Sequence, residues 1–225
     1  MAHHEHPWLT FDCSDTLVRY SEGKAVALAK LVRAKGGDDA AVDAAQVIFE
    51  GREREIQNGP FLSLSAVLGE SLRSALAAAG LECTPADGIT IIEAVCNADP
   101  FADVAPALLD LKRDHRLAIL SNSEPEIIIH SITRIGVDMD AVILASEAEC
   151  YKPAPGMFHA LLDRIGESPE NVTHIAQSFY HDIRPAKDLG FGRRIWINRY
   201  GRDSDAAYAP DAELMDLSGV REVLA

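Results

Sequence analysis

The sequence contains little cysteine and no long hydrophobic run, and both absences exclude whole classes of protein. Its apolar stretches are far too short to cross a bilayer, and its first residues lack the basic and apolar segments of a secretory signal. We therefore expect a cytoplasmic protein that does not bind membranes. Because the cysteines show no metal-ligand spacing, we expect all four to be reduced thiols: Cys13, Cys83, Cys96 and Cys150.

Basic residues are also scarce. The chain has 21 Lys and Arg against 35 Asp and Glu, a formal net charge of -14. Nucleic-acid binding needs a basic face, so we expect no nucleic-acid partner. An anionic small molecule is still compatible with this charge if a local basic pocket holds it. The opening histidines, His3, His4 and His6, have no rigid frame around them, and we expect no metal site there.

Short apolar segments alternate with helical patterns over most of the chain. The segments have the length and composition of buried strands and end in polar or turn-forming residues. Strands that alternate with helices predict a doubly wound α/β fold, in which helices cover both faces of a parallel sheet. The predicted strands are Trp8–Cys13, Leu117–Ser121, Ala141–Ala145, Val172–Ala176 and Arg194–Asn198, and the predicted helices are Val104–Arg113, Glu124–Ile135, Pro155–Ile165 and Asp182–Leu189.

The stretch from Tyr20 to Ala98 interrupts this alternation, because its pattern is helical almost throughout. A helical block between the first two strands predicts a lid over the carboxyl ends of the strands, where ligands of open α/β sheets bind. We expect a core domain of residues 1–19 and 99–225 and a helical cap domain of residues 20–98. The candidate cap helices are Ala25–Ala34, Asp39–Gln57, Leu62–Ala79 and Pro85–Cys96.

Polar side chains follow four of the predicted strands. Asp12 ends the first strand, which is a costly place for an unpaired carboxylate. A carboxylate nucleophile needs a nearby cation, which Lys152 can supply, and Asp182 can pair with Lys152 or position water. A lone strand-end aspartate is often only a helix cap, and a Lys-Pro pair is usually only a loop. Their joint occurrence with Ser121-Asn122-Ser123 on successive strands is what indicates a catalytic site. Cys13 should point away from Asp12, into the core.

This set of motifs resembles that of the haloacid dehalogenase superfamily, most closely its type II 2-haloacid dehalogenase branch. The likeness covers nearly the whole chain, cap included, and Leu120–Asn122, Tyr151–Pro153 and Trp196–Arg199 match that branch closely. The resemblance implies a role for each motif residue: Asp12 as the nucleophile, Lys152 as its counter-charge, Thr16 and Ser121 as supports, Asn122 as a contact of the substrate carboxylate, and Asp182 as the residue that completes the network.

Two departures from the superfamily pattern disfavour phosphate chemistry. Its phosphatases carry an acid where Ser14 stands, to protonate the leaving group, and a magnesium-binding acid where Gln177 stands. A dianionic phosphate with its Mg²⁺ needs those carboxylates. Asp15 is not a substitute for the first acid, because it lies one residue further along and should face elsewhere. We therefore expect a reaction that needs no metal or other cofactor.

Other departures separate the chain from typical dehalogenases. A Tyr-Gly pair commonly stands there in place of Ser14 and Asp15, so Asp15 adds a carboxylate near the pocket. Those enzymes also use an arginine early in the cap to receive the halide. Arg52 and Arg54 lie in the corresponding region, either as such ligands or as exposed helix charges.

The loop after the fourth strand adds further candidates. Gln177 and Ser178 are candidate substrate-binding residues in a loop that, in the dehalogenases, carries serine and asparagine. His181 is either a base near neutral pH or a structural residue that forms hydrogen bonds at the start of a helix.

The sequence thus predicts a hydrolase that acts at the α-carbon of a small 2-substituted carboxylic acid. Asp12 displaces the leaving group and forms an ester, and water then releases a 2-hydroxy acid. One alternative is the ring opening of a strained cyclic amino acid such as L-azetidine-2-carboxylate, whose amine Asp15 would attract. An atypical Mg-dependent phosphatase and a non-catalytic ligand-binding protein are the others. An apolar cap helix is the one hint of a homodimer.

Overall fold

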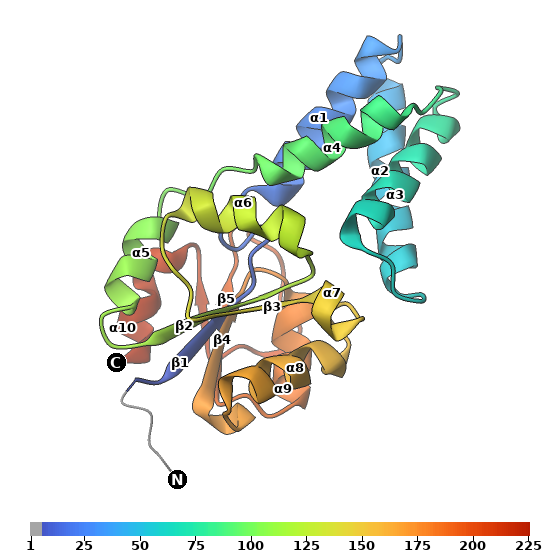
Figure 1. The fold of residues 1–225 in the computed structure, drawn as a ribbon. Helices are drawn as coiled ribbons and strands as arrows, with labels where there is room; N and C mark the ends of the chain where they lie inside the picture. Colours follow the sequence, from blue (N-terminus) through green and yellow to red (C-terminus); the bar gives the residue numbers. More distant parts are fainter. Residues whose placement is uncertain (1–5) are drawn as a thin grey trace.

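The structure is a computed structural model that describes residues 6–225, so His3 and His4 of the opening cluster lie outside it. A parallel sheet of six strands forms the centre, in the order β3-β2-β1-β4-β5-β6 (Figure 1). This arrangement confirms the predicted α/β fold. Because every pairing is parallel, the carboxyl ends of the strands share one edge of the sheet. The strands are β1 (Trp8–Phe11), β2 (Arg116–Ser121), β3 (Ala141–Leu144), β4 (Val172–Ala176), β5 (Arg193–Ile197) and β6 (Ala212–Leu214).

The strand residues alternate between two hydrophobic layers, as the period of a strand requires. Leu9 and Phe11 of β1 pack against α5, α6 and α10, whereas Trp8 lies in the layer formed with α8 and α9. Figure 1 shows the two groups of helices on opposite faces of the sheet. The helices around the sheet are α5 (Val104–Leu111), α6 (Pro125–Ile135), α7 (Ala145–Ala148), α8 (Pro155–Ile165), α9 (Arg184–Asp188) and α10 (Val220–Leu224).

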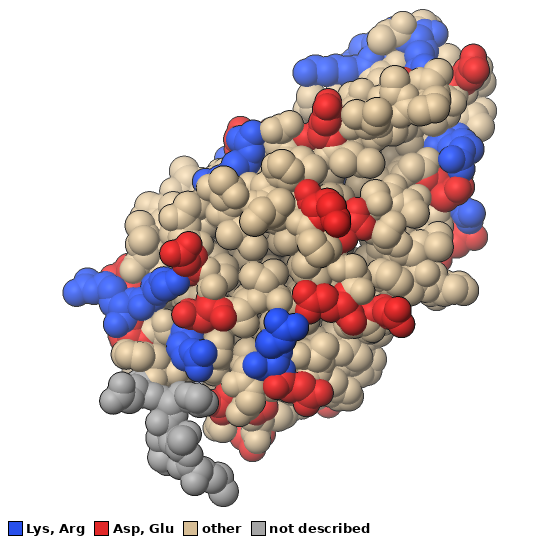
Figure 2. All heavy atoms as spheres, viewed as in Figure 1, with Lys and Arg blue, Asp and Glu red and all other residues tan. Residues whose placement is uncertain are grey.

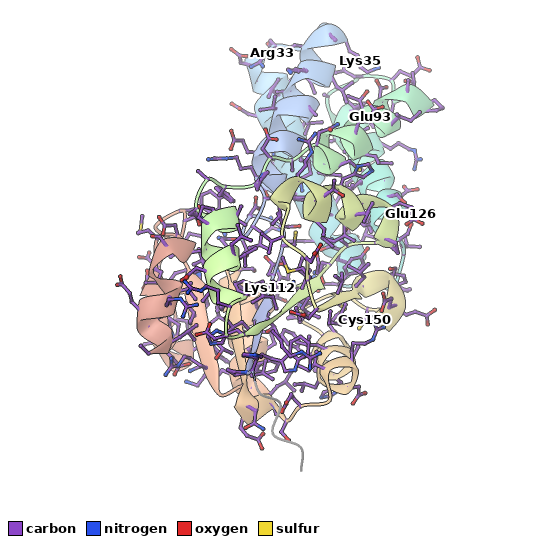
Figure 3. The ribbon with its side chains drawn as sticks, turned by 60° about the vertical axis from the view of Figure 1, so that its left-hand side comes forward. Arg33, Lys35, Glu93, Lys112, Glu126 and Cys150 are labelled. Atoms are coloured by element: carbon purple, nitrogen blue, oxygen red, sulfur yellow. The ribbon has the colours of Figure 1, made fainter. Side chains whose placement is uncertain are left out.

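Four helices between β1 and β2 form a bundle that projects from the carboxyl edge of the sheet (Figure 1). They are α1 (Tyr20–Ala34), α2 (Asp39–Gln57), α3 (Leu64–Ala78) and α4 (Pro85–Cys96). Asp38 and Ser63 cap the amino ends of α2 and α3 by accepting backbone hydrogen bonds. The bundle has a hydrophobic core of its own, and Arg33 and Lys35 lie at its end far from the sheet (Figure 3). We keep the division into a core of residues 1–19 and 99–225 and a cap of residues 20–98 as a proposal.

The structure differs from the predicted elements in several places. Residues Phe179–Ile183 form a π-helical turn before α9, so the predicted helix Asp182–Leu189 is not one continuous α-helix. Helix α1 begins at Tyr20, five residues before the predicted Ala25, and the short helices α7 and α10 were not predicted. The edge strand β6 was not predicted either, because its three residues are half-buried or exposed and carry no hydrophobic run. Within residues 6–225, no helix is long and apolar enough to span a membrane. On the face seen in Figure 2, acidic and basic side chains are interspersed.

Candidate active site

The loop after β1 places a carboxylate at the centre of the carboxyl edge. The backbone N–H of Asp12 still donates to Ile175 of β4, at 3.1 Å, so Asp12 extends the sheet by one residue. The hydroxyl of Thr16 donates to Asp12 Oδ2 at 2.6 Å and accepts from the backbone N–H of Gln177 at 2.8 Å. Cys13 is buried in the hydrophobic core, which confirms its predicted packing role.

Lys152 is the cation beside this carboxylate. Its Nζ donates to Asp12 Oδ1 at 2.8 Å, to Asp182 Oδ1 at 2.7 Å and to the carbonyl of Leu120 at 2.8 Å. All three ammonium protons are therefore used, and the side chain is buried. The structure thus brings together residues from the loops after β1, β3 and β4, as the motif order predicts.

A buried histidine, missed by the sequence analysis, orients the second carboxylate. Nε2 of His174 lies 3.0 Å from Asp182 Oδ1, and its Nδ1 lies 2.8 Å from the hydroxyl of Thr10. Thr10 and His174 are register partners on β1 and β4. Two polar residues at facing positions of two otherwise apolar strands were the signal that could have revealed this pair.

The charges of the network follow from its burial. Burial raises the pKa of Asp12, and the charge of Asp182 adds to the rise, while Lys152 and Thr16 oppose it. Burial also acts to raise the pKa of Asp182, but Lys152 and His174 hold that pKa below its usual value. Burial acts to lower the pKa of Lys152, yet the two carboxylates keep it above its usual value. Lys152 and Asp182 are therefore charged at neutral pH, and Asp12 is the first of the two carboxylates to take up a proton as the pH falls.

A cavity of about 460 Å³ opens above this network, between the sheet edge and the cap helices α1 and α2. Eight of the predicted site residues line it: Asp12, Ser14, Asp15, Asn122, Lys152, Gln177, Ser178 and Asp182. Thr16 and Ser121 lie beneath the cavity wall and are buried.

The structure does not bring Arg52 to this cavity, contrary to our expectation. Its guanidinium pairs with Glu55 at 2.8 Å, and Arg54 lines the cavity instead. Two residues that are two positions apart on a helix point in nearly opposite directions, so only one of these arginines can face the site.

Asn122 holds Lys152 in place through the backbone. Its Oδ1 accepts from the backbone N–H of Lys152 at 2.6 Å, and its Nδ2 donates to the Lys152 carbonyl at 3.1 Å. One amide proton of Asn122 remains for a ligand in the cavity. Its contact with a substrate carboxylate stays a prediction.

On the sheet side of the cavity, two lining residues each carry a buried polar atom that has no hydrogen-bond partner within residues 6–225. These atoms are Nε2 of Gln177, a donor, and Oδ2 of Asp182, an acceptor. The backbone of Gln177 is fixed, because Trp196 Nε1 donates to its carbonyl at 2.8 Å. A buried donor and a buried acceptor without partners are costly in a folded protein, so we interpret them as groups that bind water or substrate.

Asp15 has a structural role at the cavity wall. Its backbone has φ 60°, and its carboxylate accepts from the N–H of Ser21 at 2.9 Å and from the Ser21 hydroxyl at 2.5 Å. It therefore caps the first turn of α1, where Arg19 makes no side-chain capping bond. Attraction of a substrate amine to Asp15 stays a prediction.

His181 also lines the cavity, with one ring nitrogen engaged. Its Nδ1 lies 3.0 Å from the hydroxyl of Ser178, which also accepts from the His181 backbone N–H at 3.1 Å. Burial lowers the pKa of His181, so the ring is neutral at pH 7.

The cap contributes several lining residues that the sequence analysis missed, among them Tyr20, Lys24 and Glu53. Lys24 Nζ donates to Glu53 Oε2 at 2.5 Å, in a pair with little exposure. The sequence feature that could have revealed Lys24 is its spacing: it lies one turn after Tyr20 and one turn before Leu28, on the apolar face of the helix.

The residues around Asp12 do not fit a magnesium ion that bridges to a phosphate. Ser14 and Gln177 are neutral, and Asp182 Oδ1 is taken up by Lys152 and His174. Within residues 6–225, no three acidic, histidine or cysteine side chains are grouped so that they could hold a metal ion.

Comparisons with known proteins place this geometry in context. A model of haloacid dehalogenase-like hydrolases matches residues 8–190. The N-acylneuraminate-9-phosphatase of Mus musculus is 28% identical over 44% of this chain, and the match spans only 41% of that enzyme. An (S)-2-haloacid dehalogenase of Pseudomonas sp. strain YL is 25% identical over 72% of this chain and 71% of its own length. A solved L-2-haloacid dehalogenase superposes with a TM-score of 0.85 at 22% identity, over 99% of this chain and 100% of that one. Both phosphatases and dehalogenases are thus among the relatives.

Proposed function

This chain belongs to the haloacid dehalogenase-like hydrolase family, and we propose that it hydrolyses a bond at the α-carbon of a small 2-substituted carboxylic acid. One observation carries the proposal. The buried Asp12 is held by a single ammonium, that of Lys152, with the neutral Ser14 and Gln177 at the positions that phosphatases fill with acids. The site therefore suits an anionic nucleophile that attacks carbon better than one that attacks a metal-bound phosphate.

In the first step, an oxygen of Asp12 attacks the α-carbon opposite the leaving group. The carbon–halogen bond breaks, its electron pair leaves with the halide, and an ester to Asp12 forms with inversion at the carbon. Lys152 keeps the nucleophile ionised and Thr16 fixes its orientation. The remaining amide proton of Asn122 is a donor for the substrate carboxylate.

In the second step, water attacks the carboxyl carbon of the Asp12 ester. The bond from this carbon to the substrate oxygen breaks, and the 2-hydroxy acid leaves with an oxygen that came from Asp12. Gln177 Nε2 and Asp182 Oδ2, the two unpartnered wall atoms, are a donor and an acceptor for that water. Asp182 carries the proton from the water to the departing alkoxide.

Mass spectrometry in ¹⁸O water tests this reaction directly. A single turnover of 2-chloropropionate with excess enzyme should place one ¹⁸O atom in the Asp12 peptide and leave ¹⁶O in the lactate hydroxyl. The Asp12→Asn variant is the control and should form neither product nor label. Label in lactate, with none in the peptide, would mean direct attack by water. Turnover of an aryl phosphate that requires Mg²⁺, with no lactate formed, would replace the proposal by phosphatase chemistry.

A further inference from the structure

The cap wall of the cavity holds a second buried ion pair. Lys24 Nζ lies 2.5 Å from Glu53 Oε2, and the two side chains are only 6% and 12% exposed. The Lys24 ammonium also lies 4.9 Å from the ring centre of Tyr20 and 5.3 Å from that of Phe49. Both charges face the same cavity as Asp12.

Fold stability does not account for this pair. The desolvation of two charges offsets most of their attraction, so apolar residues of similar volume hold a helical bundle together at least as well. The other cap pair with little exposure, Lys35 with Asp87, lies at the far end of the bundle and away from the cavity (Figure 3). Lys24 and Glu53 are instead placed where a ligand can reach them.

Tyr20 adds an unsatisfied polar atom next to the pair. Its hydroxyl is buried and makes no well-formed hydrogen bond within residues 6–225. Burial, followed by the charge of Glu53, raises the pKa of Tyr20, so the group is a neutral hydroxyl beside a carboxylate. With Gln177 Nε2 and Asp182 Oδ2, it is the third unpartnered polar atom of this cavity.

The charges that line the cavity favour a ligand with both signs of charge. Six acidic and four basic side chains line the cavity, so its net negative charge repels a ligand that carries only a carboxylate. Both buried ammonium groups already have carboxylate partners. A ligand with both an ammonium and a carboxylate can pair its ammonium with Glu53. Lys24 is then free to pair with the ligand carboxylate, and no charge is left unpaired.

We infer that Lys24, Glu53 and Tyr20 form a subsite for the ammonium group of the substrate, so that the substrate class is 2-substituted carboxylic acids that also carry an amine. The inference rests on the proposed function for the reacting carbon. Glu53 binds the ammonium, Tyr20 accepts a further hydrogen bond from it, and Lys24 pairs with the substrate carboxylate.

A matched pair of substrates tests the subsite. The probes are 3-amino-2-chloropropanoate and 2-chlorobutanoate, which have the same shape and differ by an ammonium in place of a methyl group. The wild-type protein should prefer the amino acid in kcat/KM. In Glu53→Gln the ratio of the two kcat/KM values should fall by about ten- to a hundred-fold, because the ammonium then meets a neutral amide oxygen in place of a carboxylate. Tyr20→Phe should lower the ratio by a smaller factor.

The control is Glu55→Gln, which removes a carboxylate from the same helix outside the cavity and should leave the ratio unchanged. An unchanged ratio in folded Glu53→Gln and Tyr20→Phe, or a wild-type preference for 2-chlorobutanoate, would overturn the subsite. If neither probe is turned over, the proposed function fails by itself. Calorimetric binding of the two probes to Asp12→Asn, with and without Glu53→Gln, then decides the subsite separately, since a Glu53-dependent preference supports it and equal binding overturns it.

Discussion

At the scale of single residues, Asp12 and Asp182 share one ammonium but have pKa values shifted in opposite directions. A folded-state pKa above the unfolded value means that folding disfavours the charged form, so ionised Asp12 costs stability at neutral pH. A folded-state pKa below the unfolded value means that ionised Asp182 stabilises the fold, and that this contribution is lost as the pH falls through that pKa. Asp12 is therefore the carboxylate that folding leaves reactive as a nucleophile, whereas Asp182 anchors Lys152 and stabilises the fold in addition to its proposed role with the water.

Substitution of each aspartate should separate these roles. Asp12→Asn should abolish turnover and leave the free energy of unfolding at pH 7 unchanged or slightly higher. Asp182→Asn should lower the free energy of unfolding by about 1–3 kcal/mol, because Lys152 and His174 lose a charged partner. Urea unfolding at pH 7 and pH 3 measures both, and the loss in Asp182→Asn should be smaller at pH 3, which lies below the ordinary pKa of an aspartate. Equal destabilisation by the two variants at pH 7 would contradict this division of roles.

Asp15 combines a left-handed backbone with a helix cap, and its variants can separate the two. Asp15→Ala should lose about 1 kcal/mol for the cap and about 1–2 kcal/mol for the left-handed conformation. Asp15→Asn keeps both features and should lie within about 0.5 kcal/mol of the wild type, because asparagine tolerates this conformation, its Oδ1 can accept from the Ser21 N–H, and its Nδ2 can donate to the Ser21 hydroxyl. Chemical denaturation measures the three proteins. If Asn proves as destabilising as Ala, charge rather than backbone geometry decides the choice of Asp15.

At the scale of elements, Arg199 connects the end of β5 to the loop that carries Thr16. Its guanidinium donates twice to the carbonyl of Thr16, at 2.8 and 3.1 Å, and twice to Asp103, at 2.8 and 3.0 Å. The guanidinium also stacks over Phe101, 3.8 Å from the ring centre. This fork holds the nucleophile loop in a fixed position relative to the sheet, so Arg199 is a positioning residue.

Arg199→Lys should lower kcat at least ten-fold with little change in KM, because a lysine cannot make the forked contact and Thr16 then loses its fixed place beside Asp12. Arg194→Lys is the matched control. Arg194 lies on β5 itself and donates to Asp211 through its Nε at 3.1 Å, away from the nucleophile loop. Steady-state kinetics and thermal unfolding of both variants are the measurements. We expect both variants to lose a similar amount of stability, and kcat to fall only in Arg199→Lys. Equal kcat values in the two variants would show that the contacts of Arg199 serve folding alone.

The elements also show which features the sequence makes visible. The helices Asp39–Gln57 and Pro155–Ile165 and the strand Val172–Ala176 have the predicted bounds, because each has a regular apolar period between clear caps or turn residues. Predicted polar strand ends converge on the cavity, because parallel strands deliver their ends to one edge. Glu53 lay outside the prediction, because its partner is 29 positions away and the pairing of α1 with α2 carries no local signal.

At the scale of the whole molecule, α6 packs both in the hydrophobic core of the cap and in one of the hydrophobic layers of the sheet. Ile127 is 3% exposed and packs in the core of the cap bundle, whereas its neighbour Ile128 is 5% exposed and packs in the core of the sheet. Adjacent residues of a helix point about 100° apart, so one helix can serve both cores. Ile127 is therefore one of several contacts between cap and sheet, together with Val67 of α3, which packs in the layer of α8, and the Tyr151 hydroxyl, which donates to the Leu62 carbonyl at 2.8 Å.

Alanine at each of the two isoleucines should therefore give different patterns of local stability. Ile128→Ala should lower the global free energy of unfolding by about 2–5 kcal/mol, and amides of β1 and β4 should exchange faster. Ile127→Ala should accelerate amide exchange mainly in α1 to α4, with the sheet little affected, because it leaves a cavity in the core of the cap and removes one of the contacts between cap and sheet. Hydrogen exchange with mass spectrometry resolves the two patterns. If Ile127→Ala speeds exchange equally in the sheet and the cap, the two cores unfold as one unit, and the cavity between them cannot open without unfolding the sheet.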